Sequence, residues 1–116
     1  MTDYISNLKA VLRGMNISRI RASGDIIRKI EVAHSVPMAE VYQNLASPER
    51  LVSVELQESR RIHDETYRLY FQLGKKKRLK IVITLKTLKK RIYIVTAHYM
   101  RARTDKLIKP VRRRMR

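Results

Sequence analysis

The stretch YRLYFQLGKKKRLKIVITLKTLKKRIYIVTAHYM, residues 67–100, decides the fold. Apolar and polar residues alternate at 67–73 and again at 79–85, which is the period of half-buried strands. Short lysine-rich turns follow both runs, and a nearly continuous apolar run occupies 91–100. Strands joined by such short turns pair antiparallel, because parallel pairing needs a long crossover. The stretch therefore predicts an antiparallel meander whose last strand is central and covered on both faces.

Upstream of this stretch the pattern changes from strand to helix. An alternating run at 51–57 adds a fourth strand, and apolar residues recur at helical spacing in three earlier segments, at about 2–13, 25–33 and 37–46. Ser23 or Asp25 is placed to cap the second helix. The sequence therefore predicts an α+β fold, with two or three N-terminal helices packed on one face of a three- to four-stranded antiparallel meander sheet.

Charge divides the chain unequally. Residues 1–65 hold nine Lys/Arg and nine Asp/Glu, whereas residues 66–116 hold eighteen Lys/Arg against Asp105 alone, so the whole net charge of +17 lies in the second part. We expect one α+β domain at 1–101 and a basic C-terminal arm at 102–116. A charge this one-sided favours a polyanionic partner, although a basic surface can also serve solubility.

Several functional classes find no support in the composition. The chain has no cysteine, and its three histidines, at 34, 63 and 98, lack metal-binding spacing. Its three glycines form no phosphate-binding loop. We expect no metal and no cofactor. No apolar run reaches the length of a membrane span, and the first residues do not resemble a signal peptide, so we expect a cytoplasmic protein without a membrane partner.

The predicted nucleic-acid contacts form two basic turns, a stripe that connects them and the basic C-terminal arm. Lys and Arg neutralise phosphates, and an exposed Tyr can stack on an unpaired base. Cations at turns have another explanation, because they also discourage edge-to-edge aggregation. The predicted contacts are Arg68, Tyr70, Lys75, Lys76, Lys77, Arg78, Lys80, Lys86, Lys89, Lys90, Arg91, Arg101, Arg103, Arg112, Arg113, Arg114 and Arg116.

Three residues at the end of the last strand, His98, Tyr99 and Arg101, are the first candidates for catalysis. A histidine can act as general acid or base, and an arginine can stabilise negative charge on phosphate. A metal-independent ribonuclease needs little more, because the ribose 2′-hydroxyl supplies the nucleophile. His63, in a polar loop, is a second candidate. Alternatively, His98 is a packed strand residue and His63 an exposed loop residue.

A segment before the strands, MAEVYQNLASPE at 38–49, and the strand residues at 67–70, 78–83 and 92–99 carry a family resemblance. They resemble a small domain-of-unknown-function family that neighbours the RelE and BrnT toxins in fold. The resemblance covers about 26–101. It implies the compact RelE-like helix-plus-sheet fold, an RNA-directed role of the toxin–antitoxin kind and an acidic antitoxin as partner.

Together these patterns predict a protein that binds nucleic acid, RNA in preference to DNA. If the protein is an enzyme, they predict a metal-independent endoribonuclease. Two alternatives stay open. One is a non-catalytic RNA binder of a ribonucleoprotein. The other is a small DNA-binding protein that uses the helical segment 35–45 for recognition, although this segment carries Glu40 and no Lys or Arg.

Overall fold

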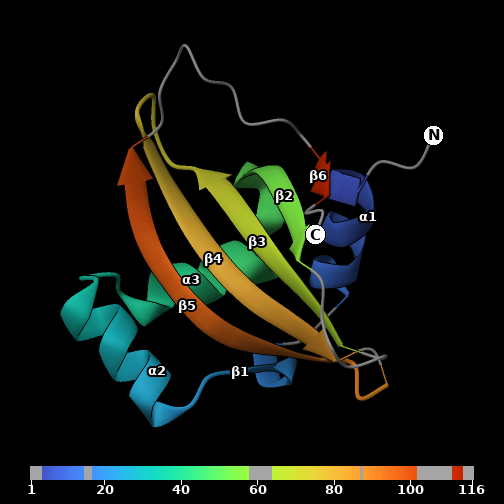
Figure 1. The fold of residues 1–116 in the computed structure, drawn as a ribbon, viewed down its shortest axis with the longest axis horizontal. Helices are drawn as coiled ribbons and strands as arrows, with labels where there is room; N and C mark the ends of the chain where they lie inside the picture. The colour runs from blue at the N-terminus through green and yellow to red at the C-terminus, as the bar shows by residue number, and fades with distance from the viewer. Residues whose placement is uncertain (1–3, 15–16, 58–63, 87, 102–110, 114–116) are drawn as a thin grey trace.

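The structure, a computed structural model, describes residues 4–14, 17–57, 64–86, 88–101 and 111–113. It has the α+β class expected from the sequence, with the helices early in the chain (Figure 1). Its sheet has six strands in the order β1-β5-β4-β3-β2-β6. The extent of the Cα trace is 39 × 39 × 28 Å.

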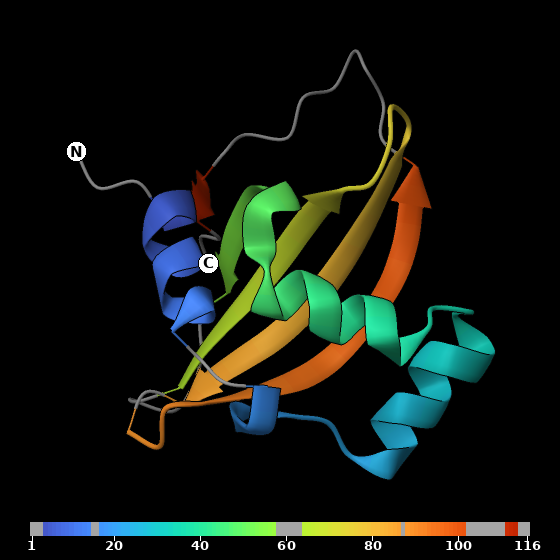
Figure 2. The ribbon, with the colours of Figure 1, turned by 180° about the vertical axis from the view of Figure 1, so that it is seen from behind.

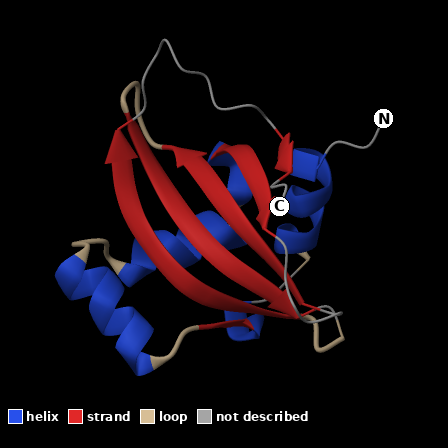
Figure 3. Cartoon of the chain, viewed as in Figure 1, coloured by secondary structure: helices blue, strands red, loops and turns tan. Residues whose placement is uncertain are grey.

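Four strands form the antiparallel part of the sheet, which Figure 3 shows in red. They are β2 (Leu51–Gln57), β3 (Asp64–Gln72), β4 (Lys77–Lys86) and β5 (Arg91–Arg101), and each pairs with the next in the chain. The alternation of apolar residues places one set of side chains on the core, since successive strand residues point to opposite faces.

The expectation of a purely antiparallel sheet is wrong, because a short parallel strand lies at each edge. β1 (Ile20–Arg21) pairs parallel with β5, and β6 (Val111–Arg113) pairs parallel with β2. Strands of two and three residues are too short to show a period of two. Both join distant parts of the chain, so the long connection that parallel pairing requires is present.

The run at 91–100 is not a central strand. β5 pairs with β4 along its length, but on its other side β1 pairs only with Ile92 and Tyr93. A register shift in the β4–β5 pairing, where Val82 pairs with Thr96 and the next residue with Ile94, leaves Val95 out of the alternation and 41% exposed. Such a bulge breaks the period of two, which explains why the run reads as continuously apolar. Beyond β1, β5 has an open edge in the described part of the chain.

The helices cover one face of the sheet. α3 (Met38–Ala46) lies across it in Figure 2, and α1 (Tyr4–Arg13) packs beside β2. α2 (Gly24–Arg28) lies beside β5 and continues as a π-helix, η2 (Lys29–Ala33). Short 3-10 helices occupy Ile17–Arg19 and Pro48–Arg50. Ser23 caps α2, since its side chain accepts a hydrogen bond from the Ile26 amide at 3.2 Å. No helix in the described ranges has the length and apolarity to cross a bilayer.

The core lies between this face and the helices. Its side chains are almost all aliphatic, and Phe71 is its one Phe, with no exposed surface. The other face of the sheet, which we call the open face, has no helix on it in Figure 1. The fully buried core residues are Leu12, Ile30, Val36, Val41, Leu45, Val54, Leu69, Phe71, Leu79, Ile81, Ile83, Ile92 and Ala97.

Candidate nucleic-acid interface and histidine pocket

The middle of the open face is charged but internally paired. Glu55 of β2 accepts a hydrogen bond from the Tyr70 hydroxyl at 2.7 Å, and its Oε1 lies 3.6 Å from the Arg68 guanidinium. Tyr70 is only 7% exposed, and the Lys80 ammonium lies 5.9 Å from its ring centroid. Two of the predicted RNA contacts, Arg68 and Tyr70, therefore have partners within the protein. Stacking on a base needs an exposed ring, and the Tyr70 ring is buried.

Lys86 is paired in the same way. Its ammonium lies 2.9 Å from Asp64 Oδ2 on the neighbouring strand and 5.6 Å from the centroid of the Tyr93 ring. Arg68, Tyr70 and Lys86, which were expected to help connect the two basic turns, thus have carboxylate partners. The basic stripe is divided into two clusters by this paired region.

The first cluster lies where β3 turns into β4, and we call it the turn cluster. Lys75, Lys76 and Lys77 are exposed there, and Lys77 stands opposite Arg101 in the β4–β5 register. The Lys77 ammonium lies 4.1 Å from the centroid of the Tyr99 ring. Within the described ranges, no carboxylate lies within 4.0 Å of a cation of this cluster. Its members are Lys75, Lys76, Lys77, Arg78 and Arg101.

The second cluster lies at the opposite end of the meander, where β4 turns into β5. Lys89 and Lys90 are exposed in this turn, and the Arg19 guanidinium donates to the Lys89 carbonyl at 3.2 Å. β1 adds Arg21, which pairs in register with Tyr93. Arg19 and Arg21 come from the half of the chain that is neutral by count. Sequence reasoning missed them because only the two-residue β1 brings them to this end.

Some predicted contacts fall elsewhere. Arg112 and Arg113 belong to β6, which flanks β2 at the edge of the sheet farthest from β1. His63, Arg103, Arg114 and Arg116 lie outside the described residues.

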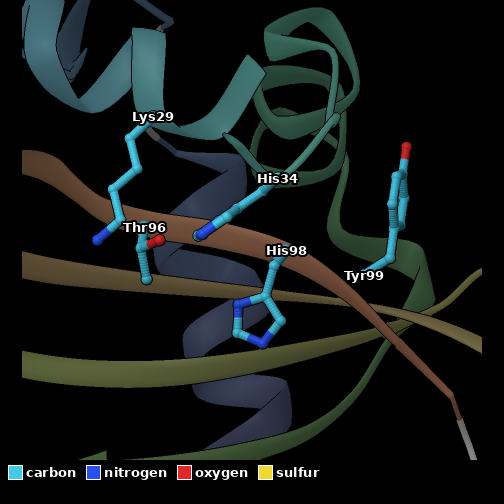
Figure 4. Close-up of a pocket in the computed structure, with 5 residues that line it drawn as sticks. All are labelled: Lys29, His34, Thr96, His98 and Tyr99. Atoms are coloured by element: carbon cyan, nitrogen blue, oxygen red, sulfur yellow. The ribbon is translucent and has the colours of Figure 1, made fainter. Parts of the chain in front are cut away.

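An open pocket of about 550 Å³ lies at the edge of β5, beside the turn cluster. Two histidines meet in it: the ring centroids of His34 and His98 are 5.6 Å apart at 82°, an edge-to-face arrangement (Figure 4). His34 ends the η2 helix, and its Nδ1 lies 2.9 Å from the Ala97 carbonyl oxygen. The lining residues are Lys29, His34, Thr96, His98 and Tyr99.

The surroundings of His98 disfavour its charged form. Burial lowers its pKa below 6.5, and the nearby charges of Lys80 and His34 lower it further. Lys80 stands directly opposite His98 in the β4–β5 register. His98 is therefore neutral at neutral pH, with a lone pair available on one ring nitrogen.

Tyr99 is engaged on the other side of β5. Its hydroxyl donates to Glu40 of α3, and this hydrogen bond, with burial and the Glu40 charge, raises its pKa to about 12. In Figure 4 its ring points away from His98. The structure therefore does not bring His98, Tyr99 and Arg101 together as one group. It places His98 beside His34 instead. His34 and its contact Ala97 are 63 residues apart in sequence, so no local sequence pattern indicated this arrangement.

Protein-family models, curated proteins and solved structures were all compared with the chain, and none matches it. Among the residues that the structure describes, no group of three or more His, Cys, Asp or Glu could hold a metal ion.

Proposed function

We propose that the protein binds single-stranded RNA through the turn cluster and the adjoining edge of β5. The observation that carries this proposal is that some basic side chains of the sheet have carboxylate partners and others do not. Arg68 in the middle of the open face and Lys86 at the end of β4 have carboxylate partners, whereas the exposed lysines of the turn cluster have none in the described ranges. Unpaired, exposed cations are the ones that can bind phosphates without first losing a partner.

The shape of this region favours a single strand over duplex DNA. The cations sit on a turn and a strand edge, and the pocket beside them is open. α3, the helix considered for DNA recognition, packs Met38, Val41 and Leu45 into the core, and its Glu40 is bonded to Tyr99. A helix held in this way offers no basic face to a major groove.

The experiment is a binding titration of the full chain with a labelled single-stranded RNA over a series of salt concentrations. We expect the affinity to fall steeply with salt. The double variant Lys75→Gln/Lys76→Gln should weaken binding about tenfold at low salt and reduce the log–log salt slope by about 1.4, since each single-strand phosphate contact contributes about 0.7.

The matched control removes two cations from α1. Arg13 pairs with Glu49 at 3.3 Å, and the Lys9 ammonium donates to the Glu49 carbonyl at 3.4 Å. Lys9→Gln/Arg13→Gln should keep both the affinity and the slope within about a factor of two of the parent. Equal losses in the two double variants would reduce the effect to net charge and contradict a site at the turn cluster. No binding at low salt would reject the proposed function as a whole.

A further inference from the structure

The histidine pocket holds more reactive groups than packing requires. Two imidazoles meet at the edge of β5, and Lys29 lines the same pocket. The turn cluster lies next to the pocket, because the Lys77 ammonium lies over the ring of Tyr99, which also lines it. An RNA strand bound to the turn cluster would therefore pass the pocket if it followed β5.

The hydrogen bond of His34 fixes its tautomer. A carbonyl oxygen can only accept, so the proton of the 2.9 Å contact with Ala97 belongs to His34 Nδ1. Because Nδ1 keeps its proton in this contact, His34 can act as an acid only through Nε2 of its doubly protonated imidazolium form. The same hydrogen bond holds the His34 ring against β5, so that its Nε2 has a defined position relative to His98.

Thr96 supplies a further sign that the pocket is built for a ligand. Its Oγ1 is buried and has no hydrogen-bond partner among the described residues. Buried hydroxyls are nearly always satisfied, and an unsatisfied one costs about 1–3 kcal/mol. Figure 4 shows this hydroxyl between Lys29 and His34.

We propose that this pocket cleaves RNA without a metal ion, with His98 as general base and His34 as general acid. The inference rests on the proposed function, because the turn cluster must first bind the strand. This pair of histidines replaces the catalytic group of His98, Tyr99 and Arg101 that the sequence suggested, because the Tyr99 hydroxyl is hydrogen-bonded to Glu40.

The reaction is a transesterification that conserves every atom and electron pair. His98 accepts the proton of a ribose 2′-hydroxyl, and the 2′-oxygen forms a bond to the adjacent phosphorus. The bond from phosphorus to the 5′-oxygen breaks, and the imidazolium form of His34 gives that oxygen the proton of its Nε2, which leaves His34 neutral and His98 protonated. The products are a 2′,3′-cyclic phosphate and a 5′-hydroxyl. Lys29 and Lys80 lie where positive charge would stabilise the negative charge that develops on the phosphate oxygens.

The pH dependence follows from the groups that surround His98. Lys29, Lys80 and His34 all face it, and no carboxylate lies within 4.0 Å of it in the described ranges. Burial and these charges lower the pKa of His98. A base of lowered pKa stays neutral to lower pH, so the rising limb of the rate profile should have its midpoint below 6.5.

The test measures cleavage and binding of one RNA oligonucleotide in EDTA, with the full chain. Two variants separate chemistry from folding. His98→Gln removes the base, and His34→Asn keeps a side-chain donor for the Ala97 carbonyl while removing the acid. Each should lower the cleavage rate about 100- to 10,000-fold, with RNA affinity within about threefold of the parent. The control Lys9→Gln, on α1, should cleave at the parental rate.

Two further readouts distinguish catalysis from a structural role. A single 2′-deoxy substitution at the cleaved nucleotide should block the reaction, because the nucleophile is missing. Added imidazole should restore part of the activity of His98→Ala, since the pocket is open enough to admit it. A merely structural histidine would not be rescued in this way.

The outcomes separate this inference from the proposed function. RNA that binds with the expected salt dependence but stays intact overturns the pocket as an active site and leaves RNA binding in place. Cleavage that persists at the parental rate in both histidine variants also overturns it. Absence of binding at low salt rejects the proposed function and the inference together.

Discussion

The helix-covered face and the open face of the sheet use alternate residues of the same four strands, yet they are stabilised differently. On the helix-covered face, Leu69, Phe71 and Ile81 have no exposed surface and pack beneath the helices. On the open face, the hydroxyls of Thr66 and Thr84 meet at 3.2 Å, and Lys86 pairs with Asp64. The first face is held by burial, and the second is satisfied by local polar contacts.

This difference shows where function can reside. A charge that is already paired must lose its partner before it binds a ligand, so the middle of the open face is poorly suited to RNA. The exposed lysines that have no carboxylate partner in the described ranges lie in the turns at the ends of the strands, and the histidine pocket lies at the edge of β5. The comparison predicts that stability depends on the covered face, and that binding depends on the ends and the edge.

The largest expected effect is on the covered face. Phe71→Ala should lower the free energy of unfolding by about 3–5 kcal/mol, because it removes a fully buried aromatic ring and leaves a cavity. Thr66→Ala, at an open-face position of the same strand, should cost less than about 1 kcal/mol. Denaturant titrations of both variants measure the contrast. Similar losses for the two would contradict the division between the faces.

A smaller effect concerns Tyr99, which links β5 to α3. Tyr99→Phe should lower the free energy of unfolding by about 1–2 kcal/mol near neutral pH, since it removes a hydrogen bond to the Glu40 carboxylate. The raised pKa of Tyr99 means that the folded state disfavours the phenolate, so this stabilisation is lost as pH rises from 10 towards about 12.

Two measurements check this prediction. The phenolate absorbance of the folded parent should include a step near pH 12 that Tyr99→Phe lacks. The stability difference between parent and variant should shrink over the same pH interval. A difference that stays constant there would mean that the Glu40 contact does not govern the ionisation of Tyr99.

The sequence predicts the strands of the meander and the helices because their hydrophobic periods extend over many residues. It does not predict β1 and β6, which are two and three residues long and pair with distant strands. It also misplaces the run at 91–100, since the bulge at Val95 makes an edge-side strand read as continuously apolar. Long local periods are therefore readable, whereas short non-local pairings are not.

The candidate site was readable only in part. The lysines of the turn cluster stand out as a charge run, and His98 stands out on its strand. The carboxylate partners of Arg68 and Lys86 depend on strand register, and the contact of His34 with Ala97 joins residues 63 apart in sequence. Charge count alone could not show which cations are paired.

The most direct test of the account is an NMR titration of the full chain with a single-stranded RNA oligonucleotide, read residue by residue along the sheet. We predict the largest amide shifts at 74–80 and 96–101, which hold the turn cluster and the edge of β5, and small shifts at 53–55 and 66–68 in the paired middle. The reverse pattern, with the middle of the open face shifting most, would contradict the claim that RNA binds the unpaired cations.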